Sequence, residues 1–346
     1  MIIAPIVCCA IPCTQASQWW MSEKRTVKGT GMLNFLRPAI VSAAALLASA
    51  VSFLPQAAFA QDANTPIQLT LQNSFIETYK DRVTISDIDF TVDQVHSHPN
   101  RASQDGDLHA AGRSDPVGLP FVAEIMNARD EPALVKRLND LQGSSQTIKL
   151  TGVWRIWPEH GGISPQVQGA DVQPATTTNP PHLFEVHPIT QLGNVDVRDT
   201  LHGIDGYKYK DASDAFQRYE AVAFELDCAS KTTTLHTKMV GFNYVDFAIQ
   251  LSEDPTHVVA DGVSVLASIL AGDDGDQLVY KRRIWFVKDS EPYTKVMTMH
   301  TGDQLHVLGI PRVDLSLVSW RCKQAKTRPE VRTWNLPYEM VVVGLL

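Results

Sequence analysis

The segment RVTISDIDFTVDQV, Arg82–Val95, alternates apolar and polar residues from Val83 onward, with one slip near Ser86. A two-residue period is typical of a strand with one buried face, and the slip predicts a β-bulge. We therefore expect a long strand here and a β-rich fold around it.

The sequence that follows predicts four more strands and one helix. The strands are expected at Asp107–Gly112, Leu119–Asn127, Thr147–Trp157 and His182–Leu192, with a bulge at Gly152. Glu131–Leu141 has leucines at i, i+4 and i+7 after Pro132, which predicts a helix. Five strands with one helix between the third and the fourth is the element order of the OB-fold, a partly open five-stranded barrel.

The second half of the chain also has mostly β periodicity. Residues 193–220 are polar, and we expect a connector with a short helix at Ser213–Tyr219. For residues 221–346 the expected strands are Phe224–Leu226, Thr233–Val240, Tyr244–Leu251, Val258–Ala271, Gln277–Val287, Leu305–Ile310, Val313–Trp320 and Tyr338–Leu346, with an amphipathic stretch at Asp289–Met299. The predicted fold class is all-β with a few short helices: an OB-like barrel over 83–192, then a second, barrel-like β module.

The first 60 residues have the pattern of a secretory signal peptide. Basic residues from Lys24 to Arg37 precede the apolar run Ala39–Leu54, which is followed by Ala58-Phe59-Ala60. We expect cleavage after Ala60 and a periplasmic or secreted bacterial protein, with residues 1–31 a misassigned start and 61–82 an N-terminal segment. The alternative is an uncleaved anchor. No later apolar run reaches the length of a membrane span, so none is expected after cleavage.

Cleavage would remove Cys8, Cys9 and Cys13 and leave Cys228 and Cys322. Two cysteines in an oxidising compartment predict a disulfide between strand ends of the second module. Two separate buried thiols are the alternative.

The charge balance is acidic. Thirty Lys and Arg against 38 Asp and Glu give −8, and beyond residue 60 the balance of 26 against 37 gives −11. Such a surface repels phosphate backbones, which disfavours general nucleic-acid binding. The sequence has no Gly-x-Ser-x-Gly elbow, Walker loop or His-Glu-x-x-His, so catalytic residues stay unassigned and enzyme activity undecided.

Histidines and carboxylates gather near two loops of the expected first barrel. In an OB-fold these loops flank the ligand-binding face, so residues distant in sequence can converge there. Imidazoles with carboxylates suit a divalent metal such as zinc. The candidate ligands are His96, His98, Asp107, His109, His160 and His187. The alternative is that these histidines hydrogen-bond the loop backbone.

Basic residues lie beside aromatic residues in two places, a combination that single-stranded nucleic acids use for phosphates and bases. The candidate binding residues are Trp154, Arg155, Trp157, Lys281, Arg282 and Arg283. The alternative, favoured by the acidic charge, places the rings in the core of their strands.

Two stretches resemble known families. Asp105-Gly106-Asp107-Leu108-His109, Leu150-Thr151-Gly152, His160-Gly161 and Glu185-Val186-His187-Pro188 are similar to D-G-D-x-H, V-T-G, H-G and E-x-H-P motifs of exported bacterial OB-like proteins. This resemblance covers about residues 83–192 and implies a fold and a compartment, but no activity. Arg282–Arg312 resembles the late part of single-stranded-DNA-binding proteins, with Thr301 in place of that family's lysine.

The sequence therefore favours an exported protein that binds a small or extended ligand on the face of its first barrel. The alternative is a metal-dependent hydrolase of phosphoesters that uses the histidines and aspartate. A third and weaker hypothesis is single-stranded nucleic-acid binding.

Overall fold

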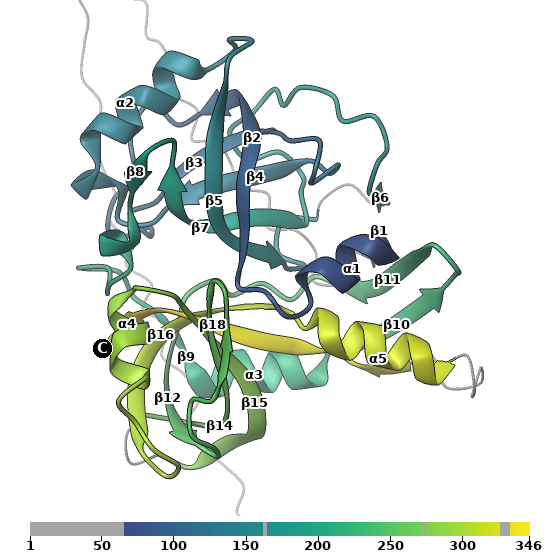
Figure 1. Cartoon of the computed structure of the whole chain (residues 1–346), viewed down its shortest axis with the longest axis vertical. Coiled ribbons are helices and arrows are strands. Elements are labelled where there is room, and N and C mark those ends of the chain that lie inside the picture. Colours follow the sequence, from purple (N-terminus) through teal and green to yellow (C-terminus); the bar gives the residue numbers. More distant parts are fainter. Residues whose placement is uncertain (1–65, 162–164, 273–274, 326–332) are drawn as a thin grey trace, which may run out of the picture. The chain divides into compact units, whose positions relative to one another are not determined.

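The computed structural model of the chain describes residues 66–161, 165–272, 275–325 and 333–346; the expected signal peptide lies outside them. Strands are the main regular structure of these residues, arranged in two closed five-stranded barrels and one smaller sheet (Figure 1). The prediction of an all-β protein with a few short helices is confirmed.

The first barrel has the strand order β4-β3-β2-β5-β7 and is closed by a parallel pairing of β4 with β7. Its strands are β2 (Thr84–Val95), β3 (Leu108–Arg113), β4 (Phe121–Ile125), β5 (Thr147–Ile156) and β7 (Phe184–Leu192). Helix α2 (Pro132–Leu141) stands between β4 and β5, after the short turn η1 (Ala128–Asp130). This is the OB-fold order that the alternating segments predict.

Both expected bulges are present in this barrel. The pairing of β2 with β5 shifts between Ile85 and Ile88, where Asp87 has φ 56°. The pairing of β5 with β7 shifts on both sides of Gly152. A Cβ at Gly152 would lie 2.5 Å from Cγ1 of Val186, so glycine lets the two backbones approach closely.

The second barrel repeats this topology. Its order is β14-β15-β18-β16-β12, closed by β12 with β14, and β15 runs parallel to β18. The strands are β12 (Val245–Leu251), β14 (Gly262–Leu270), β15 (Gln277–Val287), β16 (Gln304–Val313) and β18 (Tyr338–Leu345). Helix α4 (Glu291–Val296) stands between the third and the fourth strand, and the side chain of Ser290 caps it.

The smaller sheet joins segments far apart in the chain, in the order β17-β10-β11-β1-β6. Its strands are β1 (Pro66–Gln72), β6 (Gln166–Val167), β10 (Ala223–Cys228), β11 (Thr232–Lys238) and β17 (Thr333–Asn335), while β8 (Val195–Asp196), β9 (Lys210–Asp211) and β13 (His257–Val259) extend the barrel sheets. The remaining elements are α1 (Asn73–Tyr79), η2 (Arg198–Thr200), α3 (Ala212–Ala221) and α5 (Leu315–Ala325). None of the helices in the described ranges is long and apolar enough to span a membrane.

Two strand predictions in the second half are wrong. Val313–Trp320 is not a strand: β16 ends at Val313 and α5 begins at Leu315. Asp314 accepts a hydrogen bond from Leu317 N, and the buried Leu315, Val318 and Ser319 recur at a helical spacing. Val258–Ala271 is not one strand but a hairpin of β13 and β14, because Ala260 and Asp261 form a two-residue turn between them.

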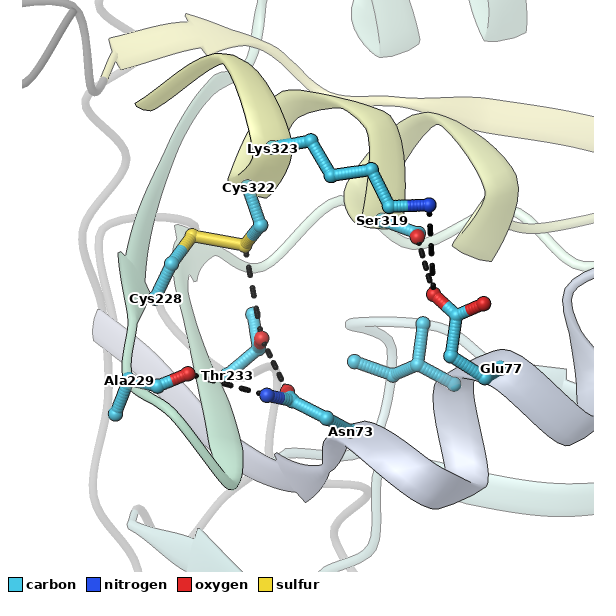
Figure 2. Close-up of a pocket in the computed structure, with 9 residues that line it drawn as sticks. Asn73, Glu77, Cys228, Ala229, Thr233, Ser319, Cys322 and Lys323 are labelled. Atoms are coloured by element: carbon cyan, nitrogen blue, oxygen red, sulfur yellow. Dashed lines mark hydrogen bonds and ion pairs between the residues drawn. A yellow bond between two sulfur atoms is a disulfide. The ribbon is translucent and has the colours of Figure 1, made fainter. Parts of the chain in front are cut away.

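The expected disulfide between Cys228 and Cys322 is present, with the two Cα atoms 5.5 Å apart. Cys228 ends β10 as predicted, whereas Cys322 lies in α5 rather than at a strand end. Figure 2 shows the bond beside Thr233, whose hydroxyl donates to Asn73. The bond therefore ties α5 to the smaller sheet.

The two barrels contact each other through a reciprocal pair of arginines. Arg155 Nε on β5 donates to the carbonyl oxygen of Pro311, and Arg312 Nη1 on β16 donates to that of Trp154. The guanidinium of Arg312 lies 3.7 Å from the Trp154 ring centroid. Both arginines are fully buried, so this contact fixes the fourth strands of the two barrels to each other.

Candidate functional site

Strand alternation in the first barrel brings polar residues together on its outer face. In β3, β4 and β7 every second residue is apolar and faces the barrel interior, and the residues between them point outward. His109 pairs with Glu124 across β3 and β4. Because β4 and β7 are parallel with Val122 opposite Glu185, Glu124 and His187 become neighbours two residues further on.

Loops and the second barrel complete this group. Asp107 immediately precedes β3, and Tyr244 immediately precedes β12 of the second barrel. We call Asp107, His109, Glu124, Glu185 and His187 the acidic cluster. The second and third strands of an OB barrel form its usual binding face, and the cluster lies on it.

Glu185 is the one carboxylate of the cluster with a permanent cationic partner. Arg155 Nη1 donates to its Oε2, and His182 Nε2 lies 3.2 Å from its Oε1. Burial alone would raise the pKa of Glu185, but Arg155 and then His182 outweigh it and hold this pKa well below its usual range. Glu185 is therefore an ionised, structurally paired group.

Glu124 has no such partner. Its Oε2 lies 3.6 Å from His109 Nε2 and 3.4 Å from His187 Nδ1. Burial, helped by the charges of Glu185 and Asp107, raises the pKa of Glu124 well above its usual range. Burial also lowers the pKa of His109 to about 3, so His109 is neutral and supplies no charge.

Asp107 and His187 are linked through the tyrosine of the second barrel. Tyr244 donates its hydroxyl proton to Asp107 Oδ2 over 2.7 Å, and His187 Nε2 lies 2.8 Å from the same hydroxyl. Burial raises the pKa of Asp107. For His187, burial acts in the opposite direction, but Glu124 and Asp107 outweigh it and raise its pKa.

Several buried atoms of the cluster have no hydrogen-bond partner among the described residues. They are Asp107 Oδ1, His187 Nδ1 and both ring nitrogens of His109. Asp107 and His187 are fully buried. Each such group costs about 1–3 kcal/mol when left unsatisfied, and their concentration at one place is typical of a binding site rather than of a core.

A cavity of about 290 Å³ opens onto the cluster at His109 and Glu124. Asp105, Glu159 and His160 of the first barrel also line it. Burial and the charge of Asp107 raise the pKa of Asp105 to about 7. Residues of the connector and of the second barrel close the other side: Tyr207, Lys208, Lys210, Phe242, Asn243 and Tyr244.

The predicted metal ligands are only partly gathered. Asp107, His109 and His187 belong to the cluster, His160 lines its cavity, and His96 stacks on His109 with ring centroids 4.9 Å apart. His98 is exposed and lines a separate groove beside α2.

Four residues of this site are not among the predicted ligands: Glu124, Glu185, His182 and Tyr244. Glu124 and Glu185 were detectable because each alternates out of phase with the apolar residues of its strand. His182 was detectable three residues before Glu185. Tyr244 had no signal, because it comes from the other barrel.

The predicted binding residues make contacts within the protein instead. Trp154 and Trp157 are fully buried, and their Nε1 atoms donate to the carbonyl oxygens of Arg82 and Gly241. Arg155 is held by Glu185 as described above. Their rings and charges are thus occupied inside the protein.

The two arginines of the basic run Lys281–Arg283 are likewise paired with carboxylates, and Lys281 Nζ lies 5.3 Å from the Tyr280 ring centroid. Arg282 Nη2 donates to Glu220, and its guanidinium covers the Tyr338 ring. Arg283 Nε donates to Glu339 over 2.6 Å. Lys281 is exposed, with φ 49°. No continuous strip of basic and stacking side chains forms from these six residues.

Comparisons with known proteins show no family. No family model matches the chain, and no curated protein matches it. A solved structure described as "Structural mimicry for functional antagonism" is 10% identical, covering 67% of this chain and 87% of that chain with a TM-score of 0.17. The crystal structure of the Ifi202 HINa domain in complex with 20bp dsDNA is 9% identical, covering 66% and 88% with a TM-score of 0.16. Similarity this weak carries no argument about function.

Proposed function

We propose that the chain is an exported binding protein that holds a small polar ligand in the cavity over the acidic cluster. The observation that carries this proposal is the set of buried polar atoms without a partner in the described residues at the cavity wall: both ring nitrogens of His109 and Oδ1 of Asn243. Polar groups that converge at the wall of a cavity are the usual mark of a ligand site.

The size and charge of the cavity limit the kinds of ligand that it can hold. Ligand pockets usually span about 300–1,000 Å³, so a cavity of about 290 Å³ favours a small molecule over an extended one. Asp105, Glu124 and Glu159 line one side of the cavity, and Lys208 and Lys210 line the other. A small ligand that carries both a cationic and an anionic group therefore suits it better than a ligand of one charge.

The proposal of export is supported by two features. Residues 39–60 have the apolar run and small-x-small end of a signal peptide, and Cys228 and Cys322 form a disulfide. Cell fractionation and thiol titration of the denatured, unreduced protein test it. We expect extracytoplasmic protein with no free thiol. Cytoplasmic protein in which Cys228 and Cys322 are free thiols contradicts export.

Ligand binding is tested at Asn243, whose buried Oδ1 has no partner in the described residues and which lines the cavity. The purified chain and its Asn243→Leu variant are screened by thermal shift against amino acids, polyamines and small sugars. We expect a compound that raises the Tm of the native protein but not that of the variant. Asn335→Leu, on an exposed position of β17, is the matched control.

The absence of any shift, together with no bound small molecule by native mass spectrometry, would contradict the proposal. A compound that stabilises Asn243→Leu as well as the native protein would place binding elsewhere.

A second candidate function is metal-dependent hydrolysis. It is favoured by Asp107, Glu124 and His187, whose potential ligand atoms all lie within 4.8 Å of one another. Hydrolysis of p-nitrophenyl phosphate and its diester, before and after chelation and with added manganese or zinc, tests it. Activity that Glu124→Gln abolishes would support this function, and an inert, metal-loaded protein would exclude these substrates.

A further inference from the structure

The hydrogen bonds of Tyr244 and His187 determine where their protons lie, and they leave a position beside His187 that needs a cation. Tyr244 has a single hydroxyl proton and donates it to Asp107 Oδ2. Its oxygen therefore accepts from His187 Nε2, 2.8 Å away, and a neutral His187 must carry its proton on Nε2. His187 Nδ1 is then a bare lone pair.

This lone pair faces two other acceptors. Glu124 Oε2 lies 3.4 Å and Glu185 Oε2 lies 3.7 Å from His187 Nδ1. A lone pair and two carboxylate oxygens repel one another in a buried site unless a positive charge lies among them. Only a proton on Nδ1 or a bound metal ion supplies it.

The geometry suits a metal ion. Two ligands at about 2.1 Å from a tetrahedral ion are about 3.4 Å apart, which is the separation of His187 Nδ1 from Glu124 Oε2. Asp107 belongs to the same group within 4.8 Å, and its Oδ1 is fully buried without a partner in the described chain. One nitrogen and two carboxylate ligands are typical of zinc, manganese or iron.

We propose that Asp107, Glu124 and His187 bind a divalent transition-metal ion. This inference rests on the proposed binding role of the same face and names the charged group that face accepts. His109, with its Nε2 3.6 Å from Glu124 Oε2, borders the remaining coordination position. Glu124 and His109 both line the cavity, so that position is reached from it.

The outer contacts match what metal sites require. A ligating histidine normally donates its second ring N–H to a fixed acceptor, and a ligating carboxylate is normally hydrogen-bonded. Tyr244 does both, for His187 and for Asp107. Because Tyr244 precedes β12, these hydrogen bonds to the proposed ligands come from the second barrel.

A second group of the same residue types lacks these features. His160, His182 and Glu185 also lie within 4.8 Å of one another. However, Glu185 is paired with Arg155, and His182 Nδ1 lies 2.6 Å from the Pro180 carbonyl. None of its nitrogen or carboxylate atoms is both buried and unpartnered among the described residues. The metal is therefore placed at Asp107 rather than at His182.

The proposal is tested with the untagged, processed chain stripped with a chelator. Zinc, manganese and cobalt are added separately, excess metal is removed by gel filtration, and metal content is measured by mass spectrometry. We expect about one ion per chain and a rise in Tm of about 5–10 °C at saturating metal. Cobalt should give the visible d–d bands of nitrogen and oxygen ligands without a thiolate band.

Glu124→Gln and His187→Gln should each weaken metal binding at least about 100-fold. His300→Gln is the matched control, because His300 is exposed and pairs loosely with Asp254, and it should bind as the native chain does. Equal binding by all four proteins would show adventitious metal and overturn the proposal. Absence of retained metal and of a cobalt spectrum in the native chain would place a proton on His187 instead.

These results are separable from those for the small ligand. A chain that binds no metal but is stabilised by a compound in an Asn243-dependent way refutes the metal site and leaves the proposed function intact. A chain that binds metal at Glu124 but no compound supports the site and refutes the small-ligand proposal.

Discussion

In both barrels an arginine on the fourth strand stands opposite a glutamate on the fifth. Arg155 pairs with Glu185 in the first barrel, and Arg312 pairs with Glu339 in the second. Each arginine also donates to the backbone of the other barrel. No strict sequence repeat links the two halves, so the shared ion pair comes from shared topology and a shared interface.

The two barrels differ at their third strands, β4 in the first barrel and β15 in the second. In the second barrel Arg283 of β15 adds a second cation to Glu339, and Trp285 Nε1 donates to the same carboxylate. In the first barrel the residue opposite Glu185 is Val122, and the next residue on the same face of β4 is the acid Glu124. We call Arg283, Arg312, Asp314 and Glu339 the balanced cluster, because two arginines face its two carboxylates. The acidic cluster of the first barrel has more carboxylates than permanent cations.

Burial of charge alone is therefore a poor sign of function. The glutamates at 124, 185 and 339 are all at most 3% exposed. What distinguishes them is the number of cations within hydrogen-bond reach: two for Glu339, one arginine for Glu185 and none that is permanent for Glu124. The same Glu→Gln substitution at each position tests this ranking.

Glu339→Gln should have the largest effect. It leaves Arg312 and Arg283 without their shared carboxylate in a buried site, and breaking such a pair costs about 3–5 kcal/mol. Urea denaturation of the metal-free protein measures the loss. A cost below about 1 kcal/mol would show that the balanced cluster contributes little to stability.

Glu185→Gln should cost less, about 2–3 kcal/mol. The Arg155 guanidinium would still have a carboxylate partner, because Glu159 Oε2 lies 2.8 Å from its Nη2. The same denaturation experiment applies, with Arg155→Lys as a control that keeps the charge. A loss as large as that of Glu339→Gln would mean that Glu159 does not compensate.

The fold was predictable where each strand buries one face. In β2 the apolar residues alternate with polar ones, and the helix between β4 and β5 changes the period clearly. The strand prediction was wrong at α5, because the residues between the buried Leu315, Val318 and Ser319 also fit a two-residue period. It also failed at β1, whose partner β11 lies more than 150 residues away.

The types of residue at the site were predictable from the sequence, but the individual residues that form it were not. Histidines and carboxylates near two loops of an OB barrel indicated the face on which the acidic cluster lies. The neighbours Glu124 and His187 depend on the parallel pairing of β4 with β7, a long-range register that local periodicity does not contain. Tyr244 depends on how the second barrel packs against the first.

The balanced cluster should also give a pH dependence. Burial and then the charge of Glu339 raise the pKa of Asp314 to about 6, against an ordinary value of 3.8. The folded state therefore holds this proton more tightly. Its contribution to stability is full below pH 4 or so and is lost as pH rises through about 6.

Asp314→Asn should remove this dependence and keep the cap on α5, because asparagine is an equally good N-cap residue. The difference in unfolding free energy between the native protein and the variant should change by on the order of 1–2 kcal/mol between pH 4 and pH 7. A constant difference across this range would show that Arg283 holds Asp314 ionised throughout.

Glu124→Gln should have the smallest effect, and of the opposite sign. With no permanent cation beside it, the buried Glu124 carboxylate is opposed by Asp107 and Glu185, so the neutral amide of the same shape should leave metal-free stability unchanged or raise it by up to about 1 kcal/mol. Denaturation in the presence of a chelator measures this. In saturating metal the order should reverse, because the native chain gains stability that the variant cannot. A cost in chelator that approaches that of Glu185→Gln would mean that His187 already supplies a compensating positive charge, and the first barrel's cluster would then be a balanced network like that of the second.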